Sequence, residues 1–412
     1  MNKKELLEFY IGLIQDDFVP YWLKYYDYEK KGILNCINNY GDEKLSDNKF
    51  TWSQGRYLWV MSRLYNLNKS GIFPHIDNNE LLVQMEGTYD FITKNSIYGA
   101  NICCFLLDRE GNKLLDEKTK RFDASIFADC FALIGMAQFT KTMERRENLT
   151  EVETLLNSII HRVEKGDFLT EPYPIPEGYK VHSIPMIMVN TLYEFIKMKE
   201  HFNLPCDREK KYALLKIRTI LEEHYDKGYI REYISTDENY EKLMVDRHIN
   251  PGHTLEDLWF CVEFLKDYGN LQEYLSRITE IARKSFDIGW DPVYGGLLRY
   301  VDKEGGEPKG SYGDSTFEAL IRSTWDMKLW WPHSETLYLF LYLYELTGEE
   351  DLLERYEKSS KYIFDTFPNK ELGEWIQIRK RDGSPEEKVV ALPVKDPFHI
   401  LRNFIKIVEL YI

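Results

Sequence analysis

A segment marked by a glycine recurs about every 67 residues, and this repeat constrains the fold of the 412-residue chain more than any other feature. In each copy the glycine opens a short strand-like run that ends at an acidic turn, as in residues 99–108 and 228–237. Self-similarity at a fixed period indicates an architecture of repeated supersecondary units. The copy at Gly166 is degraded. The marker glycines are Gly32, Gly99, Gly166, Gly228, Gly296 and Gly373, at intervals of 67, 67, 62, 68 and 77 residues.

The stretches between the glycines carry apolar residues at three- and four-residue spacing, which is the period of a helix. Residues 271–286 and 352–364 are examples. Residues 125–137 are apolar almost all round, which predicts a buried inner helix. One period has room for two helices of about 15 residues each. Six units therefore predict twelve helices.

The ends of the chain favour closure of the repeat into a ring. One helical hairpin cannot bury its own apolar face, so neighbouring units must stack, and an open stack needs polar end units. The last segment, residues 404–412, is still amphipathic and apolar. We therefore predict an all-α fold, an (α/α)6 barrel: a toroid of six helical hairpins with short β-hairpin and loop segments at one end. Residues 1–412 are expected to form this single domain, with the charged stretches 116–121 and 304–309 as rim loops.

The charge balance indicates the kind of partner. The chain has 53 Lys and Arg against 68 Asp and Glu, a net charge of −15, which argues against nucleic acid and anionic membranes. No segment reaches the roughly 18 apolar residues of a membrane span, and the acidic start does not suit a signal peptide. The six cysteines lack zinc-type spacing and predict reduced thiols. We expect a cytoplasmic protein whose partner is a small, weakly charged molecule.

Polar clusters interrupt the apolar pattern at the starts of four predicted helices. Taken singly, each is also compatible with ordinary helix capping by solvated side chains. In a ring of similar turns, however, these starts can converge at one mouth. The clusters are residues 49–59, 250–259, 328–335 and 394–402, and their candidate side chains are Trp52, Gln54, Arg56, His253, Glu256, Trp330, Trp331, His333, Glu335 and His399.

The residue types in these clusters indicate acid–base chemistry. The sequence contains no P-loop, dinucleotide fingerprint, HExxH pair or GxSxG elbow. His253 and Glu256 are three residues apart after a Pro-Gly break, so the carboxylate can orient the imidazole on one side of the first helical turn. Imidazoles, carboxylates, one guanidinium and several indoles suit proton transfer on a carbohydrate without a metal or redox cofactor.

Seven motifs in order along the chain carry a family resemblance. They are residues 52–66, 125–131, 251–256, 290–297, 328–335, 373–375 and 398–402. Together they resemble the N-acylglucosamine 2-epimerase family, whose relatives include cellobiose 2-epimerases and aldose–ketose isomerases such as mannose isomerases. The resemblance implies an isomerase with an (α/α)6 barrel, which agrees with the repeat count.

The resemblance also implies roles for individual residues. The family's essential quartet falls on Arg56, His253, Glu335 and His399, and a further carboxylate falls on Glu256. The two histidines would exchange the C2 proton from opposite faces of the sugar, because an imidazole serves as base or acid near neutral pH. The arginine would stabilise the enediolate oxygen, and the carboxylates would orient the imidazoles or assist ring opening.

Sugar contacts are expected from side chains around this quartet. Tryptophan faces stack on sugar rings, and polar side chains bind hydroxyl groups. The residues are Trp52, Gln54, Trp330, Trp331, His333, His182, Asn190 and His248. For the last four, a satisfied polar residue in a rim loop is an equal alternative.

The preferred sugar follows from one residue. The segment Pro-His333-Ser-Glu335 is similar to N-acylglucosamine epimerases, whereas the disaccharide epimerases usually carry glutamine in place of this histidine. This predicts interconversion of N-acetylglucosamine and N-acetylmannosamine through an open-chain enediolate. Residues 393–397 depart from that subfamily, which often has a Lys-Gly-Cys-like run there.

Other functions stay open at this point. An epimerase or aldose–ketose isomerase of cellobiose, glucose or mannose is the main alternative. A glycoside hydrolase using Glu256 and Glu335 would leave both histidines without a role, and a non-catalytic sugar-binding toroid would need neither. No cofactor is required. Family members that act on N-acylglucosamine can be activated by a nucleotide such as ATP, but the sequence does not indicate where it would bind. The sequence also does not decide whether the chain forms a homodimer.

Overall fold

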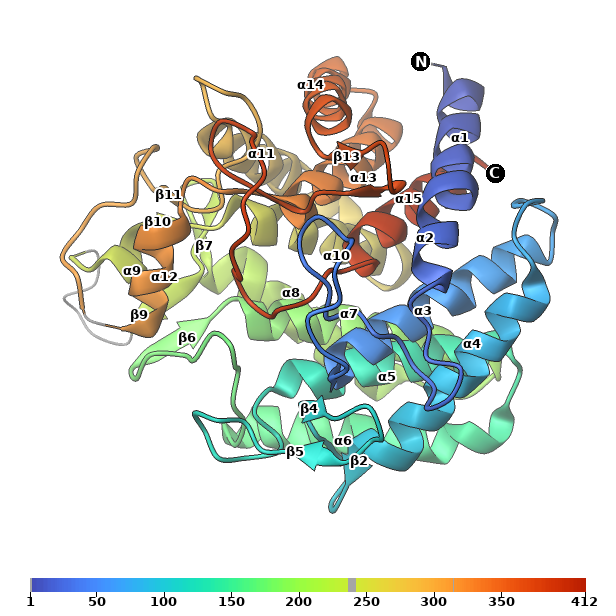
Figure 1. Cartoon of the computed structure of the whole chain (residues 1–412). Coiled ribbons are helices and arrows are strands. Elements are labelled where there is room, and N and C mark those ends of the chain that lie inside the picture. The colour runs from blue at the N-terminus through green and yellow to red at the C-terminus, as the bar shows by residue number, and fades with distance from the viewer. Residues whose placement is uncertain (1, 236–241, 314) are drawn as a thin grey trace.

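The computed structural model describes residues 2–235, 242–313 and 315–412, and within them six helices form an inner ring (Figure 1). Each inner helix packs against the next in chain order, and the last one contacts the first. The ring is therefore closed, as the apolar C-terminal segment predicted. The inner helices are α3 (Thr51–Asn68), α5 (Ile126–Thr142), α7 (Ser183–His201), α10 (Pro251–Tyr268), α13 (Trp330–Thr347) and α15 (Phe398–Tyr411).

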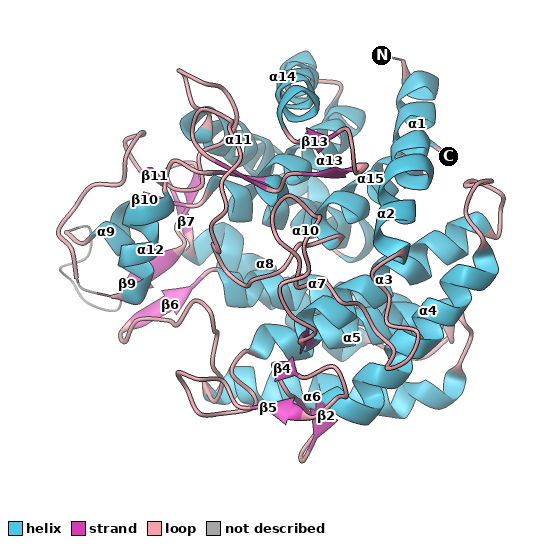
Figure 2. Cartoon of the chain, in the orientation of Figure 1, coloured by secondary structure: helices cyan, strands magenta, loops and turns pink. Residues whose placement is uncertain are grey.

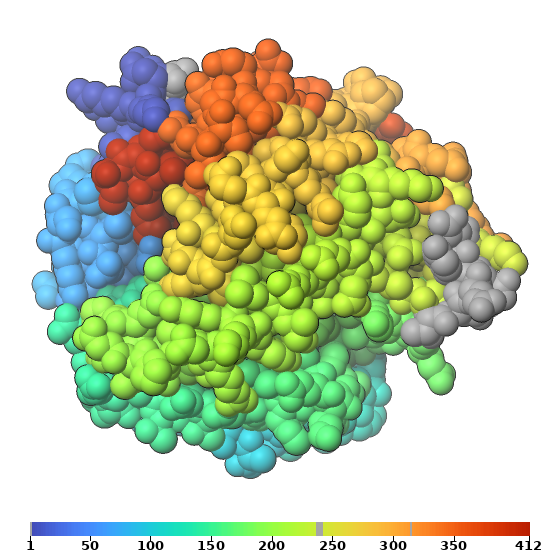
Figure 3. All heavy atoms as spheres, turned by 180° about the vertical axis from the view of Figure 1, so that it is seen from behind, coloured from blue at the N-terminus to red at the C-terminus, as the bar shows by residue number. Residues whose placement is uncertain are grey.

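A second ring of helices surrounds the first. In chain order from α3 to α13, each inner helix packs against the outer helix that follows it, and α1 packs on α15. Figure 3 shows successive units lying side by side, with the C-terminal segment beside the N-terminal ones. This arrangement confirms the predicted (α/α)6 barrel. The outer helices are α1 (Lys3–Gly12), α4 (Asn78–Phe91), α6 (Leu149–Lys165), α8 (Asp207–Arg218), α11 (Leu271–Gly289) and α14 (Glu350–Thr366).

Short elements connect the helices, and most strands contain only two residues (Figure 2). The short helices are α2 (Val19–Leu23), η1 (Leu13–Phe18), η2 (Ile92–Ser96), η3 (Arg146–Asn148), η4 (Thr219–Glu223), α9 (Met244–Arg247) and α12 (Thr316–Thr324). The strands are β1 (Lys49–Phe50), β2 (Ile97–Tyr98), β3 (Ile102–Cys103), β4 (Leu106–Leu107), β5 (Lys113–Leu114), β6 (Tyr179–Val181), β7 (Tyr225–Asp226), β8 (Tyr229–Ile230), β9 (Tyr233–Ser235), β10 (His248–Ile249), β11 (Val301–Asp302), β12 (Lys328–Leu329), β13 (Pro368–Asn369), β14 (Glu374–Trp375) and β15 (Ile378–Arg379).

The marker glycines share one structural role. All six have positive φ and follow the outer-ring helix of their unit, at a turn that an L side chain adopts only with strain. Gly166 differs from the other five because it directly caps an outer helix, α6, in the left-handed conformation. Asp237, the acidic end of the fourth copy, lies outside the described residues.

Short strands fix where three of the inner helices begin. Strand β1 pairs with β4 and ends directly before α3, and β12 pairs with β15 directly before α13. In the same way β10, paired with β11, leads into α10. These pairings hold the first turns of the inner helices at one mouth of the barrel. None of the described helices is both long and apolar enough to cross a bilayer.

Candidate active site

A cavity of about 160 Å³ opens at this mouth, among the first turns of the six inner helices. Helix N-termini carry partial positive charge, so their convergence favours negative charge developing in the cavity. The structure thus brings together side chains that are up to 347 positions apart in the sequence. The predicted residues that line the cavity are Trp52, Arg56, Asn190, His253, Glu256, Trp330, Trp331 and His399.

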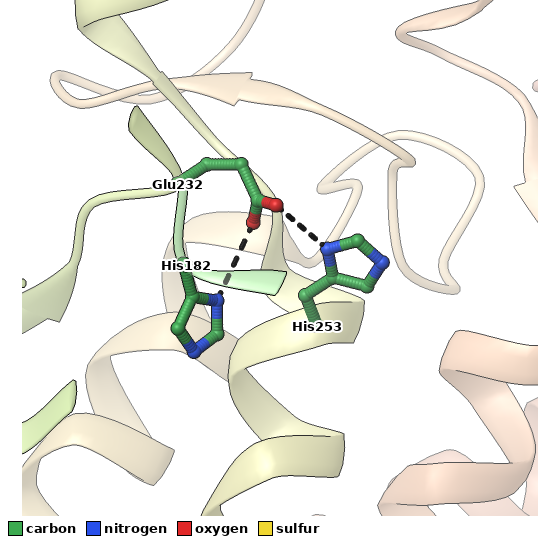
Figure 4. A group of neighbouring side chains, drawn as sticks. All are labelled: His182, Glu232 and His253. Atoms are coloured by element: carbon green, nitrogen blue, oxygen red, sulfur yellow. Dashed lines mark hydrogen bonds and ion pairs between the residues drawn. The ribbon is translucent and has the colours of Figure 1, made fainter. Parts of the chain in front are cut away.

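His253 lies in the first turn of α10 and is held from two sides. Its backbone N–H donates to the side chain of Asn250, which caps the helix, at 3.2 Å. Its ring Nδ1 lies 2.9 Å from Oε1 of Glu232, as Figure 4 shows. The second ring nitrogen is on the side away from Glu232, so it is the nitrogen available for proton transfer.

A second histidine lies behind this pair. Nδ1 of His182 is 3.6 Å from Oε2 of Glu232 (Figure 4). Its Nε2 is 3.0 Å from Oδ2 of Asp257. Burial alone would lower the pKa of His182, but the two carboxylates raise it to about 10. Burial alone would raise the pKa of Glu232, yet the two histidines hold it well below its usual value. Glu232 is therefore an anion that orients His253.

His399 lies in the first turn of α15 and is almost fully buried. Its Nδ1 is 2.7 Å from Oε1 of Glu335, and its Nε2 is 3.8 Å from Asp396. Burial lowers the pKa of His399 to about 3, although the nearby carboxylates of Glu256 and Asp396 raise it. The ring is therefore neutral at neutral pH, and with Nδ1–H donating to Glu335 it presents an unprotonated Nε2 that can accept a proton.

Arg402 connects the two carboxylates that the sequence singled out. Its Nη2 donates to Oε1 of Glu335 at 2.6 Å and also to Glu256. The indole N–H of Trp259 donates to the other oxygen of Glu335 at 2.8 Å. Glu335 is completely buried behind His399, and burial raises its pKa. Glu335 therefore acts on the ring of His399, whereas Glu256 lines the cavity directly.

Arg56 is positioned on α3 by the close approach of α5. A Cβ at Gly55 would lie 2.1 Å from the carbonyl oxygen of Phe131, so only glycine lets the two helices meet there. The guanidinium of Arg56 lies 4.0 Å from the ring centroid of Phe131 and 3.5 Å from Asp396. Burial lowers its pKa to about 10, which leaves it charged at neutral pH.

Trp331 contacts both cavity histidines. Its ring centroid is 5.2 Å from that of His253 and 5.7 Å from that of His399. Gly252 makes this position possible, because a Cβ there would lie 2.6 Å from Cη2 of Trp331. The indole therefore forms a rigid wall shared by the two imidazoles.

Replacement of Gly252 by alanine is expected to displace Trp331 and destabilise the protein by about 1–3 kcal/mol, the usual effect of overpacking. Turnover is expected to fall more than this stability loss explains at a temperature where the variant stays folded. Urea unfolding and initial rates measure the two effects. Gly12→Ala is the matched control, because a Cβ there meets only a side-chain oxygen at 4.0 Å. Equal effects at both positions would contradict this role of Gly252.

The structure places four predicted sugar contacts outside the lining of the cavity. Gln54 is buried, and its amide bonds the backbone N–H and carbonyl of Ile33. His333 uses both ring nitrogens, one with the carbonyl of Leu329 and the other with the N–H of Leu297. His182 lies behind Glu232, and His248 is buried with its Nδ1 on the carbonyl of Val245. Each is a packed polar residue of the core.

The burial of His333 predicts a pH dependence of stability. Burial lowers the pKa of His333 to about 3, whereas an unfolded histidine titrates near pH 6.5. Below that pH the unfolded chain binds a proton that the folded chain refuses, so the unfolding free energy falls as pH falls, by about 1.4 kcal/mol per pH unit from this group. Between about pH 6 and pH 4, His333→Gln is expected to lose correspondingly less stability than wild type in urea titrations. Equal slopes would contradict the buried, neutral state of His333.

Three residues of the site were missed by sequence reasoning. Glu232 stands in the strand-like run of the fourth glycine-marked segment, away from the polar clusters at the helix starts. Asp396 and Arg402 stand three residues before and after His399, which is the spacing of one helix face. That spacing is the signal that could have identified both.

Two groups in the described part of the chain have the composition of a metal site. They are His182, Glu232 and His253, and Glu256, Glu335 and His399. Hydrogen bonds and ion pairs among histidines, carboxylates and Arg402 account for both groupings. Both groups therefore form imidazole–carboxylate contacts without a metal ion.

The closed helical ring and the acid–base cavity at its mouth define an enzyme of the α/α-barrel class. The N-acylglucosamine 2-epimerase (GlcNAc 2-epimerase) family profile matches residues 32–402. The chain belongs to this family, and it is an isomerase.

Individual relatives agree with this assignment. The N-acylglucosamine 2-epimerase of Bos taurus is 27% identical over 394 residues, covering 94% of this chain and 87% of the relative. A cellobiose 2-epimerase of Dictyoglomus turgidum is 21% identical, with 96% of each chain covered. A crystal structure of a sugar epimerase from a ruminal bacterium has a TM-score of 0.77 at 19% identity, covers 98% of each chain and shares the fold.

Proposed function

We propose that this protein interconverts N-acetylglucosamine and N-acetylmannosamine by exchanging the C2 proton between two histidines. The observation that carries the proposal is that His253 and His399 line one cavity from different helices, and that both rings contact Trp331. In each ring Nδ1 is bonded to a carboxylate, which leaves Nε2 as the basic nitrogen.

The proton transfer proceeds through an enediolate. The C2 proton of the open-chain sugar becomes acidic only when the neighbouring carbonyl is polarised, and Arg56 supplies a fixed positive charge in the cavity for the developing oxyanion. One histidine removes the C2 proton and the other delivers a proton to the opposite face. The imidazolium that forms on His399 is stabilised by Glu335, and that on His253 by Glu232.

Arg402 makes a hydrolase less suited to this site. A glycosidase needs one carboxyl group as a proton donor and another as nucleophile or base. Here Glu256 and Glu335 share one guanidinium nitrogen, and Glu335 is buried behind His399. The two carboxylates therefore cannot flank a glycosidic bond.

The walls of the cavity support an N-acetyl monosaccharide as the substrate. Met186, Ile187 and Phe317 form an apolar part of the lining, which suits an acetamido methyl group. Val390 and Ala391 come from the loop before α15 and line the same cavity. Arg299 holds this loop by donating to the carbonyl of Val390 at 3.0 Å. The position of the loop restricts the space for a second sugar ring.

A panel of sugars tests the proposed function. The full chain is incubated with N-acetylglucosamine, N-acetylmannosamine, cellobiose, glucose and mannose, and products are followed by proton NMR. We expect the 2-epimer from the two N-acetyl sugars and much slower conversion of the others. A ketose would show an isomerase, cleaved cellobiose a hydrolase, and no conversion of any sugar would contradict an enzyme of this class. The double variant His253→Asn/His399→Asn controls for contaminating activity.

Further proposals concern the metal requirement of the enzyme, its location in the cell, its activation and its oligomeric state. We propose that no metal takes part, so that dialysis against a chelator leaves the rate unchanged. A cytoplasmic location is supported by six cysteines that are all free and buried. Activation by ATP and a homodimer stay predictions, which initial rates with ATP and light scattering test.

A further inference from the structure

A second cavity, of about 230 Å³, lies at the opposite end of the barrel from the active site. The C-terminal halves of the inner helices line it, and we call it the basal pocket. Five of its side chains are cations, an unusual concentration in a chain of net charge −15. They are Arg63 of α3, Lys141 of α5, Lys197 of α7, Lys266 of α10 and Lys406 of α15.

Three of these cations have carboxylate partners. Arg63 pairs with Glu409, Lys406 bonds both oxygens of Glu263 at 2.9 Å, and Lys197 pairs with Asp267 at 3.1 Å. Glu263 and Glu409 line the pocket and Asp267 lies outside its lining, so these pairs neutralise three of the five cations.

The remaining charges in the pocket are not matched. In the described ranges, Lys141 and Lys266 have no carboxylate within ion-pair distance, and the one remaining carboxylate of the lining, Glu194, has no cation at that distance. The buried Nε of Arg63 also has no hydrogen-bond partner there. The basal pocket therefore offers two ammonium groups and a guanidinium N–H as donors, beside one buried acceptor.

The negative ends of the helix dipoles do not explain this arrangement. Cations near helix C-termini are weakly stabilised by the last turn, which accounts for the exposed Lys266 but not for a cation that is also desolvated. Lys141 is half-buried, and burial together with the nearby Arg63 lowers its pKa to about 8. A desolvated ammonium and an unpaired guanidinium N–H both cost free energy that a bound acceptor would offset.

We propose that the basal pocket binds a small oxyanion of the phosphate class, with Lys141 and Lys266 as its cationic ligands and Glu194 accepting the hydroxyl proton of the anion. Donors from three helices suit the several acceptor oxygens of a tetrahedral anion. A carboxylate in the same pocket favours an anion that carries its own O–H group. Hydrogenphosphate has such a group, whereas sulfate does not. This site is independent of the proposed epimerase activity.

Calorimetric titration of the full chain with inorganic phosphate at constant ionic strength tests the proposal. We expect saturable 1:1 binding, with sulfate at least tenfold weaker because it leaves Glu194 without a donor. Methyl phosphate in a third titration tests the hydroxyl group of the anion, because its dianion carries no O–H. We expect it to bind as weakly as sulfate, and binding as tight as that of phosphate would contradict the role of Glu194. No saturable binding of inorganic phosphate, or sulfate binding as tightly as phosphate, would overturn the proposal.

Variants locate the binding in the basal pocket. Lys141→Met and Lys266→Met are each expected to weaken phosphate binding roughly tenfold or more, the loss of one charge-assisted hydrogen bond. Glu194→Gln is expected to abolish the preference for phosphate over sulfate. Lys361→Met, at a lysine that is 80% exposed on α14, is the charge-matched control and should bind as wild type. If Lys141→Met does not fold, protection of Lys141 from acylation by phosphate replaces it. Unchanged binding in both lysine variants, or no protection, would contradict the site.

Discussion

Replacement of either His253 or His399 by asparagine is expected to lower the rate of C2 epimerisation by about 10²- to 10⁴-fold, the usual contribution of a general acid–base group. Each histidine is required in both directions, because one removes the proton and the other returns one. Asparagine keeps a polar side chain of similar reach, so the carboxylates Glu232 and Glu335 retain a partner. Unfolding in urea and sugar binding by calorimetry serve as controls for fold and affinity.

The two variants are expected to differ in isotope exchange. With only one histidine left, the epimer whose C2 proton faces it still loses this proton and regains a solvent proton on the same face. In deuterated water, each variant should therefore label one epimer at C2 without inverting it, and the other variant should label the opposite epimer. Near-normal epimerisation in either variant, or labelling of the same epimer by both, would contradict the two-base mechanism.

Removal of Arg402 is expected to have the largest effect on stability. The carboxylate oxygens of Glu256 and Glu335 lie within 4.8 Å of each other, and Arg402 bonds both. The substitution Arg402→Met removes this shared cation. Breaking a buried ion pair by removing one partner typically costs about 3–5 kcal/mol. We expect a loss of this size in urea unfolding near neutral pH.

The destabilisation should depend on pH and on the second carboxylate. Burial already raises the pKa of Glu335, and removal of Arg402 raises it further, so its folded pKa lies above its unfolded value. A group of this kind stabilises the fold at low pH and loses that contribution as pH rises, so the variant should recover stability in acid. Glu256→Gln added to Arg402→Met should restore part of the loss. An unchanged loss at all pH values and in the double variant would contradict the charge-based role of Arg402.

The ring could be predicted because its signals are local. The six glycines recur at a near-constant interval, and all of them have a positive φ that favours this residue. The apolar pattern of residues 125–137 predicted the buried inner helix α5. Closure followed from the apolar C-terminal segment, which forms α15 against α3.

The details of the site could not be predicted in the same way, because they depend on which atoms meet across helices. His253 and His399 carry their signal at helix starts, but Glu232 comes from a loop segment 21 residues before its histidine. Gln54 and His333 stand beside site residues in sequence, yet both point into the core and bond backbone groups. Sequence proximity to a functional residue does not fix the direction of a side chain. His333 therefore cannot select N-acetyl sugars by touching the substrate, because both of its ring nitrogens bond backbone groups.

The most direct test of the two-histidine mechanism is the isotope content of the first product formed by the wild-type protein. N-acetylglucosamine, or the sugar that the panel identifies as substrate, is incubated in deuterated water and sampled by proton NMR at low conversion. The mechanism predicts that the new epimer carries deuterium at C2 while the remaining substrate is still protonated there. A product that retains its original C2 proton would contradict exchange between two bases.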